Sequence, residues 1–362
     1  MNKGNRVLYR QSRFPVLQNR VFDSQQAARD CAAGEILLVQ DCATGLIRNA
    51  SFDASLLTYD STYHNEQEYS AVFKHHLGVV ADIVERHLGT AALVEIGCGK
   101  GYFLELLASR GFSIAGFDPT YEGVNPRVQK SFVCPSTSLQ AAGVILRHVL
   151  EHVPDPVAFL NQIRTANEGE GRIYIEVPCF DWIRENRAWF DIFYEHVNYF
   201  RLEDFNRIFD CIVQTGRLFG GQYLYCIAEL GSLRDSPRSG WTLSSLPDNF
   251  LPLELASPPN NAARLSCKEA MWGCASKGVI FGLLRTRAGR PLDVTIDINP
   301  NKHGMYLPGS GLLVSPPGAG LAQLPPGSTI YVMNGMYAAE IEAAGGPDYN
   351  YVILPRPRDG QG

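Results

Sequence analysis

The chain has 362 residues, a formal net charge of −5 and nine cysteines. This length favours two or three packed units over a single core, and the small acidic excess gives no support to a nucleic-acid partner. The cysteines form no C-x-x-C pair, and an odd, scattered set argues against a disulfide framework. No window approaches the roughly 18 apolar residues of a membrane span. We therefore expect a cytoplasmic protein with neither nucleic acid nor membrane as a partner.

The N-terminal segment, residues 1–66, mixes turn formers with short apolar runs such as residues 35–39. This pattern predicts a small appended cap. Apolar residues then recur at helical spacing between Tyr69 and Leu88, and Gly89 follows as a plausible helix stop. A helix therefore leads from the cap into the next unit.

That unit, residues 67–230, alternates short buried strands with helices. An apolar run at residues 91–96 ends in a glycine loop, and a helical pattern follows. A second buried strand is expected at residues 113–118, with further strands at 144–146 and 173–177. Such alternation predicts a parallel sheet with ligands at the carboxyl ends of its strands.

The composition shifts to Ser, Pro and Asn over residues 231–262, which predicts a linker. Residues 263–362 then show a second alternating pattern, with strand-like runs at 269–273, 294–297 and 330–334 and a helical stretch at 277–285. We expect an α/β fold in which a central Rossmann-like domain carries a small N-terminal cap and a second, C-terminal Rossmann-like domain.

The glycine loop points to a nucleoside cofactor. The strand ending at Glu95 runs into Gly97-x-Gly99-x-Gly101, and glycines allow a ligand to approach the backbone closely. Asp118 ends the next strand, where a carboxylate can accept ribose hydroxyls. The alternative is an ordinary strand-to-helix turn.

The spacing of the glycines disfavours a dinucleotide, because Tyr102 and Leu104 occupy the two possible third-glycine positions of G-x-G-x-x-G. With an acidic residue two positions before its first glycine, the segment from Glu95 to Gly101 instead resembles motif I of class I methyltransferases. That resemblance implies S-adenosylmethionine as the cofactor and S-adenosylhomocysteine as its product.

Two histidine clusters follow. His148-x-x-Glu151-His152 matches the inverted zinc-peptidase pattern, and a zinc hydrolase is the alternative from another class. Val153 and Pro154 should cut the helix that such a metal site needs, so we predict no metal there. The segment from Arg147 to Pro156 also resembles the post-strand segment of methyltransferases, which would place it beside the cofactor.

The second cluster, Tyr194 to Phe200, sets an imidazole among phenols and a carboxylate. His196 could titrate near neutrality and act as a base. The alternative is a histidine that only packs in the core.

Taken together, these motifs resemble a family of three-domain C-methyltransferases that act on deoxysugar nucleotides in antibiotic biosynthesis. The likeness spans nearly the whole chain and rests on the glycine loop, the two histidine segments and two C-terminal motifs, Trp272 to Gly278 and Asp297 to Gly309. It implies methyl transfer to carbon of a small-molecule acceptor after a Glu-His pair removes a proton.

The resemblance assigns roles to individual residues. The catalytic candidates are His196 as base, with Glu195, Tyr194 and Tyr199 orienting the base or the substrate. The cofactor candidates are Glu95, Gly97, Cys98, Gly99, Gly101, Tyr102, Phe103, Asp118, Pro119, Arg147, His148 and His152. The substrate candidates are Tyr63, Asn198, Lys277, Lys302 and His303, the last three as cations for an acceptor that carries phosphates.

One departure from the family lies in the cap, where relatives commonly hold zinc with four cysteines. Only Cys31 and Cys42 are candidates here, too few for a tetrahedral site. We therefore expect no zinc. O- or N-methylation of a natural-product intermediate, a domain that binds the cofactor without turnover, and either a monomer or a homodimer all remain open.

Overall fold

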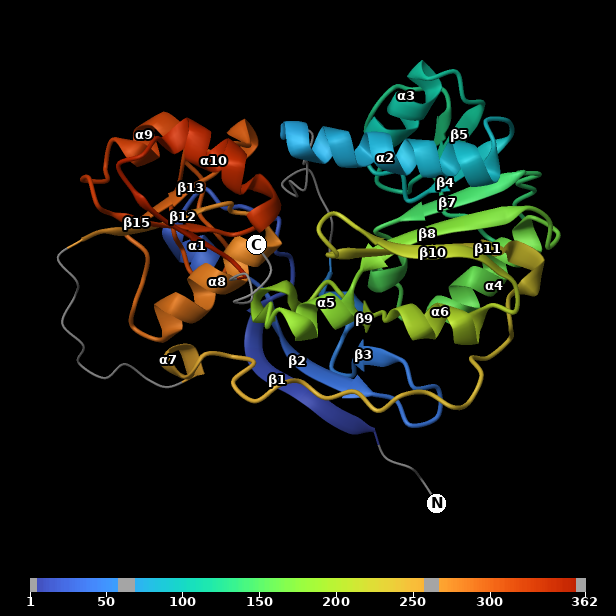
Figure 1. Ribbon diagram of the computed structural model, residues 1–362, viewed down its shortest axis with the longest axis horizontal. Coiled ribbons are helices and arrows are strands. Elements are labelled where there is room, and N and C mark those ends of the chain that lie inside the picture. The colour runs from blue at the N-terminus through green and yellow to red at the C-terminus, as the bar shows by residue number, and fades with distance from the viewer. Residues whose placement is uncertain (1–4, 58–68, 257–266, 356–362) are drawn as a thin grey trace.

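The computed structural model describes residues 5–57, 69–256 and 267–355. Three β-sheets organise the molecule, one in the N-terminal segment, one in the central unit and one in the C-terminal unit (Figure 1). Tyr63 and residues 257–262 of the expected linker lie outside the described residues. Within the described ranges, no helix is both long and apolar enough to cross a bilayer.

The cap is an antiparallel sheet of order β1-β2-β3-β9. Its apolar run at residues 35–39 lies inside β2, where alternate side chains are buried. The last strand comes from far along the chain, and Ile47 pairs with Tyr199. The second histidine segment is therefore attached to the cap. The elements are β1 (Arg6–Pro15), α1 (Gln25–Arg29), β2 (Ala33–Gln40), β3 (Ile47–Asn49), η1 (Ala54–Leu56) and β9 (Asn198–Tyr199).

The central sheet has seven strands in the order β10-β11-β8-β7-β4-β5-β6. All neighbours are parallel except those of β11, which runs antiparallel to both β8 and β10. The strands are β4 (Leu93–Ile96), β5 (Ile114–Phe117), β6 (Val128–Gln129), β7 (Gly143–Arg147), β8 (Arg172–Pro178), β10 (Ile212–Leu218) and β11 (Tyr223–Glu229). This confirms the expected Rossmann-like sheet, and its order with one reversed strand is the class I methyltransferase fold.

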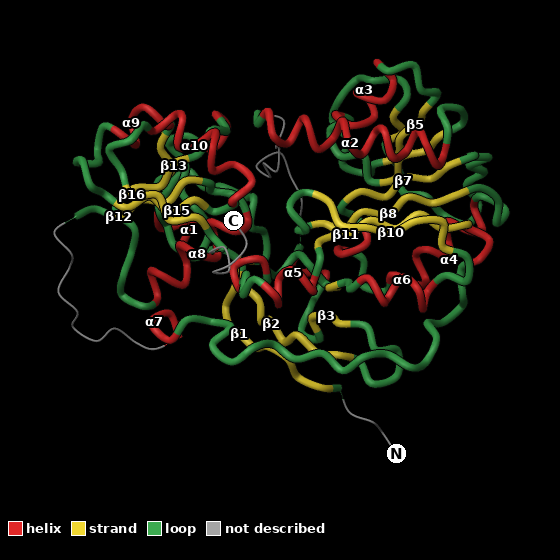
Figure 2. Tube along the Cα trace, viewed as in Figure 1, coloured by secondary structure: helices red, strands yellow, loops and turns green. Residues whose placement is uncertain are grey.

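Helices cover both faces of this sheet (Figure 2). Both faces of the sheet are apolar and need such cover, as alternate residues of β7 illustrate. Ile145 packs on the side of α2 and α3, whereas Val144 and Leu146 face the opposite core. The helical elements are α2 (Ala71–Leu88), α3 (Tyr102–Ser109), η2 (Leu150–His152), α4 (Pro156–Ala166), α5 (Phe180–Glu185), η3 (Trp189–Asp191), α6 (Leu202–Ile208) and η4 (Leu230–Ser232).

The C-terminal unit is a second parallel sheet, of order β14-β13-β12-β15-β16. This confirms the expected second Rossmann-like unit. One of its faces packs on α9 and α10, and the other packs through α8 on the cap and the central unit. Its elements are β12 (Glu269–Trp272), α8 (Ser276–Arg287), β13 (Val294–Ile296), η5 (Pro300–Lys302), β14 (Val314–Ser315), α9 (Pro317–Leu321), β15 (Thr329–Val332), η6 (Gly335–Tyr337), α10 (Ala338–Gly345) and β16 (Asn350–Ile353).

The described part of the segment that follows the central unit, up to α7 (Leu253–Ala256), runs along the underside of the molecule (Figure 1). The buried side chain of Arg201 donates to the backbone oxygens of Gly45 and Thr242 and pairs with Asp204. A single guanidinium therefore ties the cap, α6 and this connecting segment together.

Candidate active site

The glycine loop between β4 and α3 is built for close approach of a ligand. Gly97, Gly99 and Gly101 have φ values of 73°, 54° and 83°, a region that favours glycine. A Cβ on Gly97 would lie 2.4 Å from Val149, whereas one on Gly99 would meet nothing within 4 Å. The absence of a side chain at Gly97 thus lets Val149, in the loop after β7, pack closely against the glycine loop. Gly99 leaves open space beside the backbone.

Asp118 stands at the end of β5 and holds this loop in place. Its Oδ2 accepts from the backbone N–H of Gly99 at 2.8 Å, and its Oδ1 accepts from the backbone and hydroxyl of Thr120. A carboxylate has about four acceptor positions, so one on Oδ2 remains for a ribose hydroxyl. The structure therefore brings the glycine loop and the acidic residue together.

Glu95 lies beneath the loop with a carboxylate that is 3% exposed. Its Oε2 has no hydrogen-bond partner. Burial raises the pKa of Glu95 to about 7. A buried acceptor of this kind fits the amino group of an amino-acid ligand, which would supply the missing hydrogen bond and the opposite charge.

The side chains beside the loop form the wall of the site. The guanidinium of Arg147 lies over the ring of Phe103, with its Cζ 4.5 Å from the ring centroid, and donates to Glu176 at 3.2 Å. Tyr102 begins α3, and Pro119 follows Asp118 in the turn after β5. Cys98 is buried, and burial raises its thiol pKa to about 12, so the thiol stays protonated.

Glu176 is the buried centre of a charged cluster that the sequence did not reveal. It accepts from Arg147 and from the hydroxyl of Tyr174, and it contacts the rings of His76 and His148. Burial alone would raise the pKa of Glu176, but Arg147 and the two histidines hold it well below its usual range. A carboxylate inside an otherwise apolar strand is the signal that could have found it.

His148 joins this cluster to Glu151. Its Nε2 lies 3.1 Å from Glu176 and its Nδ1 lies 3.3 Å from Glu151. Burial alone would lower the pKa of His148, but hydrogen bonds to both carboxylates raise it to about 9. Both ring nitrogens are thus engaged, and residues 150–152 form a single 3-10 turn. The helix that a zinc peptidase needs does not form.

His196 and His152 come together at the bottom of the site. Their ring centroids are 5.0 Å apart, and the ring of Phe193 lies 4.0 Å from His196. The Nδ1 of His196 is buried without a hydrogen-bond partner. Burial, together with the charges of His152, His148 and Lys277, lowers the pKa of His196 well below its usual range. At neutral pH this imidazole is therefore uncharged.

The other catalytic candidates are engaged with the surrounding protein. Glu195 accepts from the backbone N–H of Gln18 in the cap, at 2.8 Å. The hydroxyl of Tyr194 accepts from the backbone of Asp53, also in the cap. The Tyr199 ring lies 6.2 Å from His196, but its hydroxyl is bonded to the backbone of Phe193. These three residues shape the segment around His196.

The substrate candidates are spread more widely. Asn198 donates to the backbone oxygen of Val153, which fixes the loop after η2. Lys277 reaches from α8 to Asp191 at 3.0 Å and to Gln222 at 2.6 Å, at the contact with the central unit.

The remaining cations belong to the C-terminal unit. Lys302 is only 2% exposed and lies near Asn19 and the carbonyl of Cys274. His303 bonds the backbone oxygen of Asp297 at 2.8 Å. A buried ammonium with protein partners is poorly placed for a phosphate, so the structure does not bring the predicted cations to one site.

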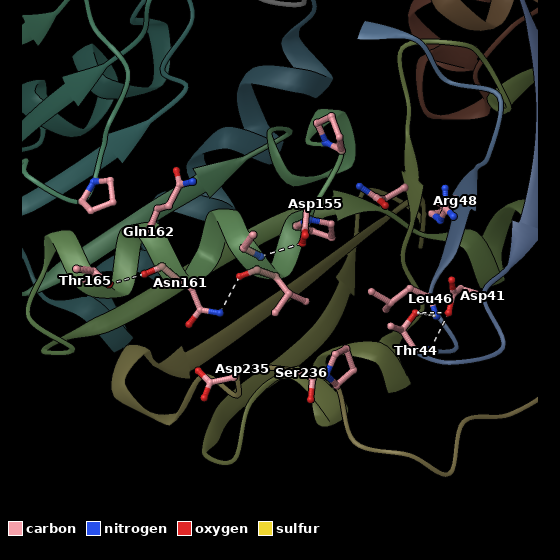
Figure 3. Close-up of a pocket in the computed structure, with 17 residues that line it drawn as sticks. Asp41, Thr44, Leu46, Arg48, Asp155, Asn161, Gln162, Thr165, Asp235 and Ser236 are labelled. Atoms are coloured by element: carbon pink, nitrogen blue, oxygen red, sulfur yellow. Dashed lines mark hydrogen bonds between the residues drawn. The ribbon is translucent and has the colours of Figure 1, made fainter.

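A groove of about 650 Å³ is lined by neither the glycine loop nor His196, and Figure 3 shows residues that do line it. Its walls are the first turns of α4, the cap turn around Thr44 and the segment around Ser236, and it touches Asn198. The candidate chemical groups lie elsewhere, in the glycine loop and the histidine pair, so geometry and charge favour these over the groove.

The central unit matches known methyltransferases. Residues 73–211 match the family model described as a methyltransferase domain. These residues include the glycine loop, Asp118 and both histidine segments. Together with the sheet order, this match shows the class I methyltransferase fold, and the open loop, Asp118 and the partnerless Glu95 oxygen fit S-adenosylmethionine as the cofactor.

Among curated proteins, the chain is similar to the C-methyltransferase NovU of Streptomyces niveus, with 26% identity over 151 residues. That alignment covers 37% of this chain and 36% of the relative's length. Among solved structures, a 1,6-didemethyltoxoflavin-N1-methyltransferase from Burkholderia thailandensis is 17% identical, with a TM-score of 0.35 over 52% of this chain and 96% of that one. The PH0226 protein of Pyrococcus horikoshii OT3 is 12% identical, with a TM-score of 0.36 over 50% of this chain and 100% of that one.

Proposed function

We propose that the protein transfers a methyl group from S-adenosylmethionine to a carbon atom of a small-molecule acceptor, and that His196 takes the proton from that carbon. The single observation that carries this proposal is the buried, uncharged imidazole of His196, whose Nδ1 has no partner in the protein. The similarity to a C-methyltransferase supports carbon as the acceptor atom.

Different residues of this chain contact different parts of the cofactor. The open loop at Gly99 and the free acceptor position on Asp118 bind the nucleoside, and Glu95 binds the amino group. Bound S-adenosylmethionine supplies an electrophilic methyl group on a sulfonium. Arg147 and Phe103 close one side of the site and help to exclude water.

His196 supplies the base. Carbon is a poor nucleophile until it loses a proton, and an uncharged imidazole can accept one without first releasing its own. A carbon next to a ketone is acidic enough for such a base, so a keto-sugar nucleotide or a similar carbon acid is the favoured acceptor class. Glu195 and Tyr199 keep the His196 segment fixed between the cap and the central sheet.

The variant His196→Asn tests the proposal. We expect turnover with a keto-sugar nucleotide to fall by about 10²- to 10⁴-fold, the usual contribution of a general base, while the affinity for S-adenosylhomocysteine stays within about twofold because His196 does not bind the nucleoside. Solvent deuterium should also enter the acceptor carbon in the presence of S-adenosylhomocysteine, and H196N should abolish this exchange.

A matched control is His75→Asn, which removes an exposed histidine from α2. It should retain both turnover and exchange. Mass fragmentation and carbon NMR of the product separate C-methylation from O- or N-methylation. Unchanged turnover in H196N would refute His196 as base, and a methylated oxygen or nitrogen would refute the carbon acceptor.

A further inference from the structure

Three side chains that can ligate a metal converge beside the cofactor loop. Glu151, His152 and His196 each offer one ligand atom, and these atoms all lie within 4.8 Å of one another. Glu151 and His152 belong to η2, whereas His196 comes from a segment 44 positions further along the chain than His152. The fold, and not proximity in the sequence, therefore brings the three side chains together.

Two of the three side chains have buried polar atoms without partners. Glu151 is 1% exposed and its Oε2 has no hydrogen bond, and His196 is 7% exposed with a partnerless Nδ1. Burying an acceptor without a hydrogen-bond partner is unfavourable. Two such atoms in one cluster therefore indicate that something absent from the protein itself completes it.

Two of the three groups are also held in position by neighbouring residues. The Nδ1 of His152 lies 2.9 Å from the carbonyl oxygen of Glu195. Because a carbonyl only accepts, this nitrogen carries the proton and Nε2 keeps its lone pair. The other oxygen of Glu151 is held by His148 at 3.3 Å. Histidine ligands in metal sites are characteristically fixed in this way by a carbonyl or carboxylate.

We propose that Glu151, His152 and His196 form a binding site for a zinc-class divalent cation. Two imidazoles and one carboxylate are a common set of three protein ligands, with a fourth position left open. Tetrahedral bonds of about 2.0 Å put the ligand atoms about 3.3 Å apart. The three atoms would therefore approach one another by up to about 1.5 Å, which rotation of the side chains can provide.

This site differs from the one that the H-x-x-E-H pattern suggests. His148 is not a ligand, since both of its nitrogens are bonded to carboxylates. His196 takes its place, brought in by the segment that β9 anchors to the cap. The sequence gives no metal prediction for this combination, because His196 is remote from the pattern.

The metal would control the activity, a consequence that rests on the proposed function. A cation on His196 occupies the lone pair that would accept the proton from carbon, so a bound metal and proton transfer exclude each other. The nucleoside contacts at Gly99 and Asp118 involve other atoms. Zinc should therefore inhibit methyl transfer without displacing S-adenosylhomocysteine.

The test is titration of the full, chelator-treated protein with Zn²⁺ against a chromophoric chelator, together with the absorption spectrum of the Co²⁺ form. We expect one equivalent of Zn²⁺ and a spectrum of low-symmetry Co²⁺ with nitrogen ligands. Glu151→Gln and His152→Asn should each weaken binding by about 100-fold, at or beyond the 10- to 100-fold typical of losing only an outer partner. The control His75→Asn should bind zinc as the unaltered protein does.

Specific outcomes would overturn the proposal. Absence of stoichiometric binding, or binding that both E151Q and H152N retain, would remove the site. A cooperative thermal melt shows whether each variant is folded, and H152N, at a partly exposed position, remains informative if E151Q does not fold. Zinc that binds but leaves turnover unchanged would overturn the inhibitory role. Failure to bind zinc leaves the proposed methyl transfer intact, so the two proposals fail separately.

Discussion

The central and C-terminal sheets share the same strand-loop-helix arrangement, but the surroundings of the two loops differ. In each, the first strand runs into a glycine-containing loop and a helix, and an aspartate ends the second strand. Asp118 accepts from the backbone of Gly99 at 2.8 Å, and Asp297 accepts from the backbone of Cys274 at 2.6 Å. Both loops are therefore clamped by the same device, at the edge where parallel α/β sheets bind ligands.

What fills the space beside each loop differs. A Cβ on Gly99 would meet nothing within 4 Å. At the C-terminal loop, the ammonium of Lys302 lies 3.3 Å from the carbonyl of Cys274 and 3.4 Å from the side chain of Asn19, which itself donates to Ser276. The second loop is thus occupied by the cap. The same topology leaves open space beside the loop in one unit and forms a docking point for the cap in the other.

The sharpest test of this comparison is the pair Asp118→Ala and Asp297→Ala. D118A should weaken S-adenosylhomocysteine binding by about 30-fold, because it removes a hydrogen bond to a charged acceptor worth about 2 kcal/mol. D297A should leave that affinity unchanged but lower stability by about 3 kcal/mol, because it removes the acceptor for the backbone N–H groups of Cys274 and Asn299. Calorimetric titration and thermal melting measure the two effects. Equal loss of affinity in both variants would show that the two loops are not functionally distinct.

Lys302→Ala tests whether the second loop is a docking point. Removing the ammonium and its buried stem should lower the free energy of unfolding by about 2 kcal/mol and the melting temperature by about 5 °C. Exchange of the amides near Asn19 should accelerate, since the cap loses a partner. The matched control is Lys268→Ala, an exposed lysine beside β12 whose loss should shift the melting temperature little. If K302A instead left stability unchanged and abolished acceptor binding, the phosphate role predicted from the sequence would regain support.

The acid beneath the first loop has no counterpart beneath the second. Glu95 lies two positions before Gly97, and Met271 occupies the matching place before Gly273. Because burial raises the pKa of Glu95 to about 7, the free site is largely protonated at pH 6, whereas an ammonium ligand prefers the carboxylate. Binding then releases a proton at low pH. Affinity should rise with pH and level off above about 7, and at pH 6 it should be about tenfold below its plateau.

Titration of S-adenosylhomocysteine between these pH values checks the slope. Glu95→Gln cannot ionise, so its affinity should be lower than the plateau and flat with pH. A slope that persists in E95Q would assign the proton to another group.

Much of the fold was accessible from the sequence, because its strongest signals are local. The strands expected at residues 91–96 and 113–118 appear as Leu93–Ile96 and Ile114–Phe117, and the helix expected from Tyr69 appears as Ala71–Leu88. The hairpin of β10 and β11 was missed. The pair Gly220-Gly221 between its strands was the available turn signal.

Some features of the candidate site could likewise be predicted from the sequence, and others could not. The glycine loop and Asp118 follow strands in a regular order, so their meeting could be predicted. The pairing of His196 with His152 could not, since it depends on the two-residue strand β9 joining the cap sheet. Tyr194 was expected to orient the base, but its hydroxyl is bonded to Asp53 because that side chain faces the cap.

The contact that Glu340 makes between the two Rossmann-like units gives the smallest effect. Glu340 in the first turn of α10 accepts from the hydroxyl of Ser70 at 2.8 Å and from the backbone of Val72 at 3.1 Å. It thereby caps α2, the helix that covers the central sheet. Glu340→Ala should lower the free energy of unfolding by about 1 kcal/mol, as loss of a helix cap does. It should also speed hydrogen exchange of the first α2 amides about fivefold. Glu342→Ala, exposed on the same helix, is the control. If E340A left the hydrogen-exchange protection of α2 unchanged, this contact would not stabilise α2, and the two units would be joined by other contacts such as the ion pair of Lys277 with Asp191.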